Sequence, residues 1–284
     1  MKTKKSAVYI LNLLGIGTAI SLLGDATLYT VLPHPAISAE LGITLSMVGL
    51  LLAANRAVRL ILNGPVGILY DRMPRRGLLI GALSLGACSS IFYALSTGFL
   101  PLFMGRITWG LAWSLLWIGG NSVVLDLSTD ENRGQNSGIY QMWFFIGVAG
   151  SSFVGATLTD LVGFRSSQWI SVSIIAATAL VWFFFLPETK LDNTIPQENH
   201  RDFDASKPIR LPWKLLTVTS LTIFTARLIA WGVIAATAIL WLSDIFETGV
   251  QAASFFIPIA TLTGIFSSLS NLISVISTPL AGSI

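Results

Sequence analysis

The sequence predicts an all-α integral membrane protein, and three observations support this prediction. Only 11% of the 284 residues are charged, whereas a soluble domain usually carries about 25%. Hydrophobic residues make up 53% of the chain and fall into long runs with few or no charges. Most runs approach or exceed the ~20 residues that a helix needs to cross ~30 Å of hydrocarbon, and they lack the alternation of a β-barrel. This composition argues strongly against a water-soluble enzyme.

Eight transmembrane helices are predicted from these runs. The first run follows a basic N-terminus but has no clear small-residue cleavage site, so we interpret it as a retained helix and not as a signal peptide. The second and seventh runs are interrupted only by Arg56, Arg59 and Arg227. The predicted helices lie near residues 7–31, 46–69, 77–97, 99–127, 137–159, 166–186, 214–243 and 250–280.

The loops between these helices predict the orientation of the chain. One set of loops holds twelve Lys and Arg residues, and the other set holds only Arg165. By the positive-inside rule, the N-terminus and the polar segment 187–213 are cytoplasmic. This linker divides residues 1–186, with six helices, from residues 214–284, with two. We expect a monomer in the lipid bilayer of the cell (plasma or inner) membrane.

Few residues offer catalytic or metal-binding chemistry. The formal net charge of +3 is too small to indicate a nucleic-acid-binding protein. The single cysteine, Cys88, and the two histidines, His34 and His200, show no metal-ligand spacing. They also supply no cluster of nucleophile and base, which argues against a membrane enzyme. We therefore expect no cofactor, no metal and no enzymatic activity.

A motif with a recognisable pattern follows the second predicted helix. The chain there reads Gly67-Ile68-Leu69-Tyr70-Asp71-Arg72-Met73-Pro74-Arg75-Arg76. This resembles the signature loop of the major facilitator superfamily, G-x-x-x-D-R-x-G-R-R, with Pro74 in place of the last glycine. Asp25 before Leu32-Pro33, and Arg106 before Gly110, are similar to further motifs of that family.

The resemblance implies the fold of this superfamily, with a complete N-terminal six-helix bundle and the first two helices of a C-terminal bundle. The offset of 215 residues between Gly67 and Gly282 would place the counterpart of Asp71 two positions beyond Ile284. We therefore interpret the chain as a C-terminally truncated member, with a natural eight-helix protein as the alternative. Gly147, Gly150 and Gly155 loosely resemble the family's fifth-helix motif, and we expect them to pack helices together.

The resemblance also implies a cytoplasmic gate. Asp71 is expected to contact the opposite half, and Arg75 or Arg76 is expected to reach Asp126 at the end of the fourth helix. A loop that only sets topology is the alternative. The expected gating residues are Gly67, Asp71, Arg72, Arg75, Arg76 and Asp126.

Charged residues inside the predicted helices are costly and tend to mark function. Asp25, Arg56 and Arg106 all lie roughly 10–15 Å below the outer surface at ~1.5 Å per residue. We expect Asp25 to pair with Arg56, Arg106 or both, either to couple transport or only to fix packing. Residues expected to contact substrate or couple protons are Asp25, Arg56, Arg59, Arg106, Trp113 and Trp117. The two tryptophans share a helix face with Arg106, and the alternative is that they only pack against neighbouring helices.

These features predict a secondary active transporter of a small solute that works by alternating access, through proton-coupled efflux or antiport. Its expected partners are the solute and protons. The alternatives are a membrane scaffold or receptor that does not transport, and an inactive fragment of a transporter.

Overall fold

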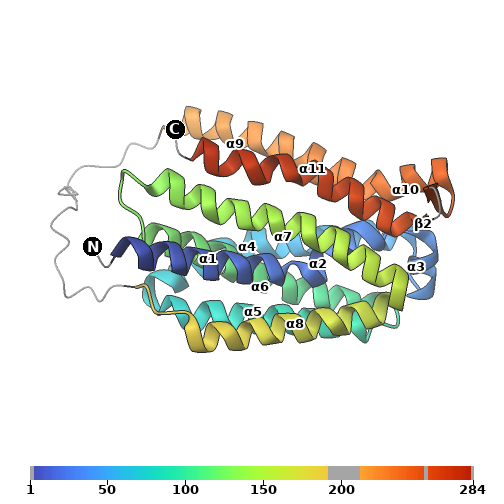
Figure 1. The fold of residues 1–284 in the computed structure, drawn as a ribbon, viewed down its shortest axis with the longest axis horizontal. Coiled ribbons are helices and arrows are strands. Elements are labelled where there is room, and N and C mark those ends of the chain that lie inside the picture. The colour runs from blue at the N-terminus through green and yellow to red at the C-terminus, as the bar shows by residue number, and fades with distance from the viewer. Residues whose placement is uncertain (1–2, 191–211, 253–254, 283–284) are drawn as a thin grey trace.

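The computed structural model describes residues 3–190, 212–252 and 255–282. Helices make up most of this structure and run side by side along one axis (Figure 1). The helices before residue 190 are α1 (Thr3–Ser21), α2 (Leu23–Val31), α3 (Pro35–Glu40), α4 (Leu45–Arg72), α5 (Arg75–Ala94), α6 (Phe99–Asp126), α7 (Arg133–Val162) and α8 (Phe164–Phe185). Among the described residues, seven helical segments are long and apolar enough to cross a membrane.

The first six of these segments agree with the predicted spans to within a few residues. The first span is bent, because α1 ends at Ser21 and α2 starts at Leu23. At the bend the Ser21 hydroxyl donates a hydrogen bond to the Thr18 carbonyl at 2.6 Å. Side-chain bonds of this kind compete with the helical ladder. The bend places Asp25 in the first turn of α2.

The core of the bundle lies around α6, which packs against α4 and α5. Its residues Trp109, Trp113 and Leu116 are buried in the largest apolar cluster. Large apolar side chains also cover the outside of the molecule, among them Leu60, which is 85% exposed. Such a surface is unfavourable in water and suits the hydrocarbon of a bilayer.

Glycines let α7 approach the first span closely. A Cβ atom at Gly147 would overlap the backbone of Ala19, and one at Gly155 would overlap the side chain of Thr27. The Thr27 hydroxyl donates to the Ser151 carbonyl at 3.2 Å across the same contact. Gly150 differs from the prediction, because a Cβ there would meet no described atom within 4 Å. Gly150 faces away from α1 and α2 and packs no helix there.

The chain beyond residue 211 adds helices and one hairpin. These elements are α9 (Trp213–Arg227), a π-helix (Leu228–Ile234), α10 (Ala235–Phe246), β1 (Gly249–Ala252), β2 (Phe255–Pro258) and α11 (Ile259–Ala281). The predicted span 214–243 is helical in three consecutive pieces from α9 to α10, but it is not among the seven described segments that are long and apolar enough to cross a membrane. Most of the predicted linker 187–213 falls on residues 191–211, outside the described part, as does the side chain of Arg227.

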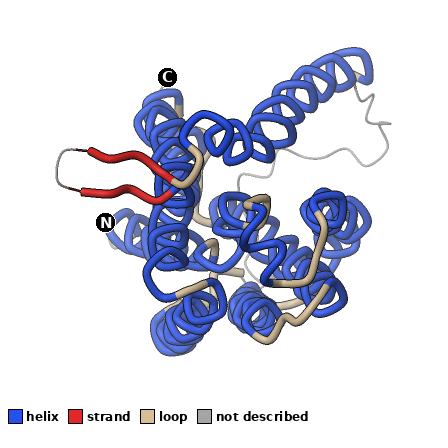
Figure 2. The backbone as a smooth tube through the Cα atoms, turned by 90° about the vertical axis from the view of Figure 1, so that its right-hand side faces the viewer, coloured by secondary structure: helices blue, strands red, loops and turns tan. Residues whose placement is uncertain are grey.

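The prediction of a helix from residue 250 was wrong for the described residues 250–252 and 255–258. Strands β1 and β2 pair antiparallel there, and Val250 pairs with Ile257 (Figure 2). Gly249 adopts a φ of 154°, which other residues rarely do. Pro258 occupies the N-cap position of α11 and disfavours helix in the residue before it. The helix therefore starts at Ile259.

Helix α11 lies along α7 over most of its length (Figure 1). Near mid-length the Ser268 hydroxyl donates to the Ala149 carbonyl at 2.6 Å. At one end the Asp160 carboxylate accepts hydrogen bonds from the Thr261 amide, at 2.8 Å, and the Thr261 hydroxyl. At the other end Gly134 and Gly282 are in close contact. Helix α11 therefore forms one continuous interface with α7.

Candidate functional site

A buried ion pair joins three helices of the bundle. Arg106 on α6 is fully buried, and its Nη1 atom pairs with the carboxylate of Asp25 on α2. Its Nε atom donates to the Leu51 carbonyl on α4 at 3.0 Å, and Nη2 donates to the Tyr29 hydroxyl at 2.9 Å. The predicted pairing of Asp25 with Arg106 is thus present. One guanidinium holds α2, α4 and α6 together.

The other two predicted arginines lie over aromatic rings. The guanidinium of Arg56 is 5.6 Å from the ring centroid of Tyr29, and that of Arg59 is 5.8 Å from the ring of Trp113. Both arginines are close enough to attract the Asp25 carboxylate electrostatically. Arg106 itself is 5.1 Å from the Tyr29 ring. The structure therefore brings Asp25 and the three arginines into one cluster, with Tyr29 at its centre.

Aromatic side chains on α6 continue from this cluster along the helix. Trp113 stacks on Trp109 and Trp117, with centroid distances of 5.8 and 5.7 Å. Trp117 also meets the edge of Phe144 on α7 at 5.2 Å. Trp113 and Trp117 share a face as predicted, and they pack between α6 and α7. Trp113 in addition provides the ring on which Arg59 rests.

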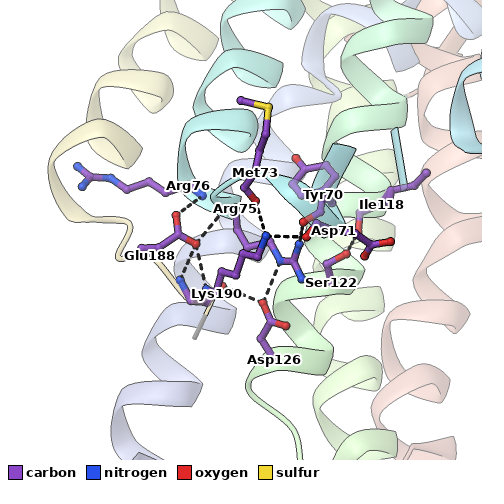
Figure 3. A network of polar contacts seen from close by, with 11 residues as sticks. Tyr70, Asp71, Met73, Arg75, Arg76, Ile118, Ser122, Asp126, Glu188 and Lys190 are labelled. Atoms are coloured by element: carbon purple, nitrogen blue, oxygen red, sulfur yellow. Dashed lines mark hydrogen bonds and ion pairs between the residues drawn. The ribbon is translucent and has the colours of Figure 1, made fainter. Parts of the chain in front are cut away.

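At one end of the bundle, a second polar cluster surrounds the loop between α4 and α5. We call it the Arg75 cluster; it consists of Arg75, Arg76, Asp126, Glu188 and Lys190 (Figure 3), together with Thr189. The Nε atom of Arg75 lies 3.1 Å from an Asp126 oxygen, which is the predicted contact between the loop and α6. The Thr189 hydroxyl donates to the same carboxylate at 3.3 Å. Arg76 instead donates to the Phe183 carbonyl on α8.

Glu188 caps the first turn of α5 from a distant part of the chain. Pro74 is the N-cap residue and makes no side-chain cap. The Glu188 carboxylate accepts the backbone amides of Arg75, at 2.9 Å, and Arg76, at 3.0 Å. Partial burial alone would raise the pKa of Glu188, but hydrogen bonds from four backbone amides outweigh burial and lower that pKa. The carboxylate replaces a cap that proline cannot supply.

The remaining motif residues are placed differently from the gate prediction. Asp71 is exposed, and its carbonyl accepts a hydrogen bond from the Lys190 ammonium at 2.7 Å. The predicted contact of its carboxylate with the opposite half is absent among the described residues. Arg72 is exposed, and a Cβ at Gly67 would meet no described atom within 4 Å.

Sequence reasoning missed several members of both clusters. Tyr29 lies one turn beyond Asp25, so the two side chains share a face of the helix. This spacing was the sequence signal that Tyr29 lies beside the buried acid. Glu188 and Lys190 follow α8 directly. The proline at the N-cap of α5 indicated only that the first backbone amides of α5 need a hydrogen-bond acceptor from elsewhere in the chain. No local pattern links Glu188 to a helix more than 100 residues earlier.

Seven membrane-length segments around a buried ion pair define a multi-pass α-helical membrane protein. The chain belongs to the Major Facilitator Superfamily, whose sequence profile matches residues 14–284. This confirms the predicted family and fold class.

Individual relatives are distant and longer than this chain. The inner membrane transport protein YajR of Escherichia coli is 26% identical over 168 residues, which is 58% of this chain and 36% of YajR. The glucose transporter GlcP of Staphylococcus epidermidis is 26% identical over 199 residues, covering 66% of this chain and 41% of GlcP. The chain thus spans less than half the length of these relatives. A POT family transporter solved with 5-aminolevulinic acid shares the fold, with a TM-score of 0.64 and 12% identity over 96% of this chain and 68% of that chain.

Proposed function

We propose that this protein is a secondary active transporter of a small solute, coupled to protons as an efflux or antiport system. The observation that carries the proposal is the buried pair of Asp25 and Arg106, which joins α2, α4 and α6. Burying two charges costs several kcal/mol per ion, so a pair of this kind is a poor way to gain stability. Ionisable groups inside membrane spans mark ion and proton pathways.

The geometry indicates how a proton would act on this pair. When Asp25 is ionised, its carboxylate holds Arg106, and Arg106 holds the Leu51 carbonyl of α4. A proton on Asp25 removes the ionic attraction but leaves the bonds of Arg106 to Leu51 and Tyr29. The first span is then held to Arg106 only by the neutral Tyr29 hydroxyl, so its attachment to α6 is weaker. Movement of the two halves around a midplane site would use this weakening.

The Arg75 cluster is proposed as the rigid part of a cytoplasmic gate. Arg75, Asp126 and Glu188 fasten α5, α6 and the end of α8 to one another. This leaves the exposed Asp71 and Arg72 at the surface, where Asp71 is proposed to contact the opposite half when the protein closes to the cytoplasm. The same proposal places the N-terminus in the cytoplasm and the protein, as a monomer, in the cell membrane.

A flux assay on the chain in proteoliposomes tests the proposal. Labelled D-glucose, naphthalenesulfonate and a trimethylammonium analogue of it serve as a neutral, an anionic and a cationic probe. We expect at least one probe to accumulate in wild-type proteoliposomes under a pH gradient and to be released when a protonophore is added. Proteoliposomes with Asp25→Asn should not accumulate that probe. The matched control is Asp130→Asn, at an exposed acid whose ion pair among the described residues is with nearby Arg133. A folded wild type that moves none of the probes would overturn the proposal in favour of a non-transporting scaffold.

A further inference from the structure

Two helices of the bundle start after a proline and take their cap from a distant segment. Helix α5 has Pro74 at its N-cap, and the Glu188 carboxylate accepts its first two backbone amides. Helix α11 has Pro258 at its N-cap, and the N-cap side chain makes no hydrogen bond. The Asp160 carboxylate of α7 accepts the Thr261 amide at 2.8 Å and the Thr261 hydroxyl. Asp160 therefore caps α11 as Glu188 caps α5.

The two caps differ in the parts of the chain that they join. Glu188 follows α8 directly and caps a helix of the six-helix bundle that α8 completes. Asp160 and Thr261 lie on opposite sides of the predicted linker 187–213, so their contact joins the two proposed halves. Movement of the halves leaves the Glu188 cap intact. The Asp160 cap exists only while the halves meet at this end.

The Asp160 cap lies at one end of the long contact between α7 and α11. Helix α7 has 30 residues, and Asp160 is the third from its end. At ~1.5 Å per residue, Asp160 is about 40 Å along the helix axis from the other end, where Gly134 meets Gly282. Helix α1 also starts at the Gly134 end (Figure 1). In the proposed orientation, with the N-terminus in the cytoplasm, Asp160 therefore marks the outer end.

Small side chains and one exposed carboxylate hold the outer end of this contact. Ala260 shares a buried cluster with Ala156 of α7, and a Cβ atom at Gly264 would press against the same alanine. Small side chains bury little apolar surface each, so hydrogen bonds to a charged group are an important part of the attachment. Asp160 is exposed. Water can therefore replace Thr261 as its partner at modest cost, which a buried ion pair would not allow.

We propose that Asp160 is the latch of the outer gate, a carboxylate that holds the first turn of α11 against α7 while the protein is closed to the outside. The latch opens when water replaces Thr261 as the partner of the carboxylate. The two helices then part at this end and pivot on the glycine contact at the other. The inference rests on the proposed transport function and adds the residue that sets the balance between its closed and open states.

Distances between paired spin labels on the purified chain in lipid nanodiscs test the latch. The labels are attached at Leu161→Cys and Phe266→Cys, two exposed positions near the outer end, in a Cys88→Ser background. We expect this parent to show mainly one short distance. Asp160→Ala should raise the ratio of long to short distances about tenfold, because loss of a charged helix cap shifts an equilibrium by about that factor. Position 266 lies more than one turn beyond Thr261, so fraying of the first turn would not move its label.

Two conservative variants grade the effect, and one variant controls for the loss of a cap as such. Asp160→Asn keeps an acceptor oxygen without the charge and should fall between the parent and Asp160→Ala. Thr261→Val removes only the hydroxyl and should raise the ratio about threefold. The matched control is Glu188→Ala, which removes the cap of α5 and should leave the ratio unchanged. A second label pair, at Gln135→Cys and Leu280→Cys near the glycine contact, should keep its distance in every variant.

Three results would overturn the latch. They are a ratio in Asp160→Ala equal to that of the parent, an equal rise in Glu188→Ala, and separation of the second label pair in Asp160→Ala. Failure of the two proposals can be told apart, because the distances are measured without solute. Flux with an unchanged ratio refutes the latch and keeps the transporter. A tenfold rise without any flux refutes the transporter and keeps Asp160 as the contact that holds α7 and α11 together.

Discussion

Arg106 shows how one side chain can organise a membrane bundle. It pairs with Asp25 and donates to Leu51 and Tyr29, so that it contacts two other helices. The sequence predicted the pair, because Asp25 and Arg106 lie at similar depths and a lone buried charge would be costly. It did not predict Tyr29, because an aromatic residue in an apolar helix has many possible roles.

Removing Arg106 alone should strongly destabilise the protein. Arg106→Met leaves the Asp25 carboxylate buried without its partner, which costs about 3–5 kcal/mol. The double variant Asp25→Leu/Arg106→Met should recover most of this loss, because it removes both charges. Thermal unfolding in detergent measures both variants against wild type. A single variant as stable as wild type, or a double variant no better than the single, would contradict the view that the pair is a matched buried charge.

The Glu188 cap should make stability depend on pH in acid. The pKa of Glu188 is lowered in the folded protein, below the 4.5 of an unperturbed glutamate. Its contribution is therefore complete above about pH 4.5 and is lost as the pH falls through the folded pKa.

At neutral pH, Glu188→Gln should lower stability by about 0.5–1 kcal/mol, allowing for solvent screening at this exposed site. The difference from wild type should shrink as the pH falls from 4.5 through the lowered pKa of Glu188, as followed by thermal unfolding. Glu131→Gln, at an exposed acid in the loop between α6 and α7, should show no such difference. A gap that never narrows as the pH falls below 4.5 would rule out the ionised cap.

At the scale of helices, the glycines of α7 offer a paired test of close packing. Gly155→Leu forces a side chain into Thr27 of α2 and should cost about 1–3 kcal/mol. Gly150→Leu, on the same helix, enters open space and should leave stability near that of wild type. Unfolding of the two variants in detergent compares them directly. Equal destabilisation would show that contact with the first span does not distinguish these two positions.

The sequence predicted the long spans better than it predicted the chain beyond residue 243. Span lengths follow from bilayer thickness, so runs of uncharged residues located six helices closely. Residues 249–258 are also largely apolar, and run length alone cannot separate a hairpin from the start of a helix. Gly249 and Pro258 were the local signals for the turn into α11. The bend at Leu22, beside the hydrogen bond of the Ser21 hydroxyl, had no hydrophobic signature.

At the scale of the whole molecule, the interface between α7 and α11 links the two parts of the chain. It extends from Asp160 and Thr261 at one end to Gly134 and Gly282 at the other. The family was predictable because Asp71, Arg72, Arg75 and Arg76 stand in a specific register. The interface between α7 and α11 was not predictable, because small residues occur throughout the chain and one sequence does not show which of them meet. The proposed rocking motion would require these contacts to change at one end while they hold at the other.

The central claim is that Asp25 couples protons to the movement of solute, and proton movement driven by solute tests it most directly. Proteoliposomes are loaded with a trapped pH-sensitive dye and with a probe that the wild type moves in the flux assay, and are then diluted into solute-free buffer. As the solute leaves, the account predicts acidification of the interior by wild type and by Asp130→Asn, and none by Asp25→Asn. Acidification by Asp25→Asn at the wild-type rate would contradict the claim.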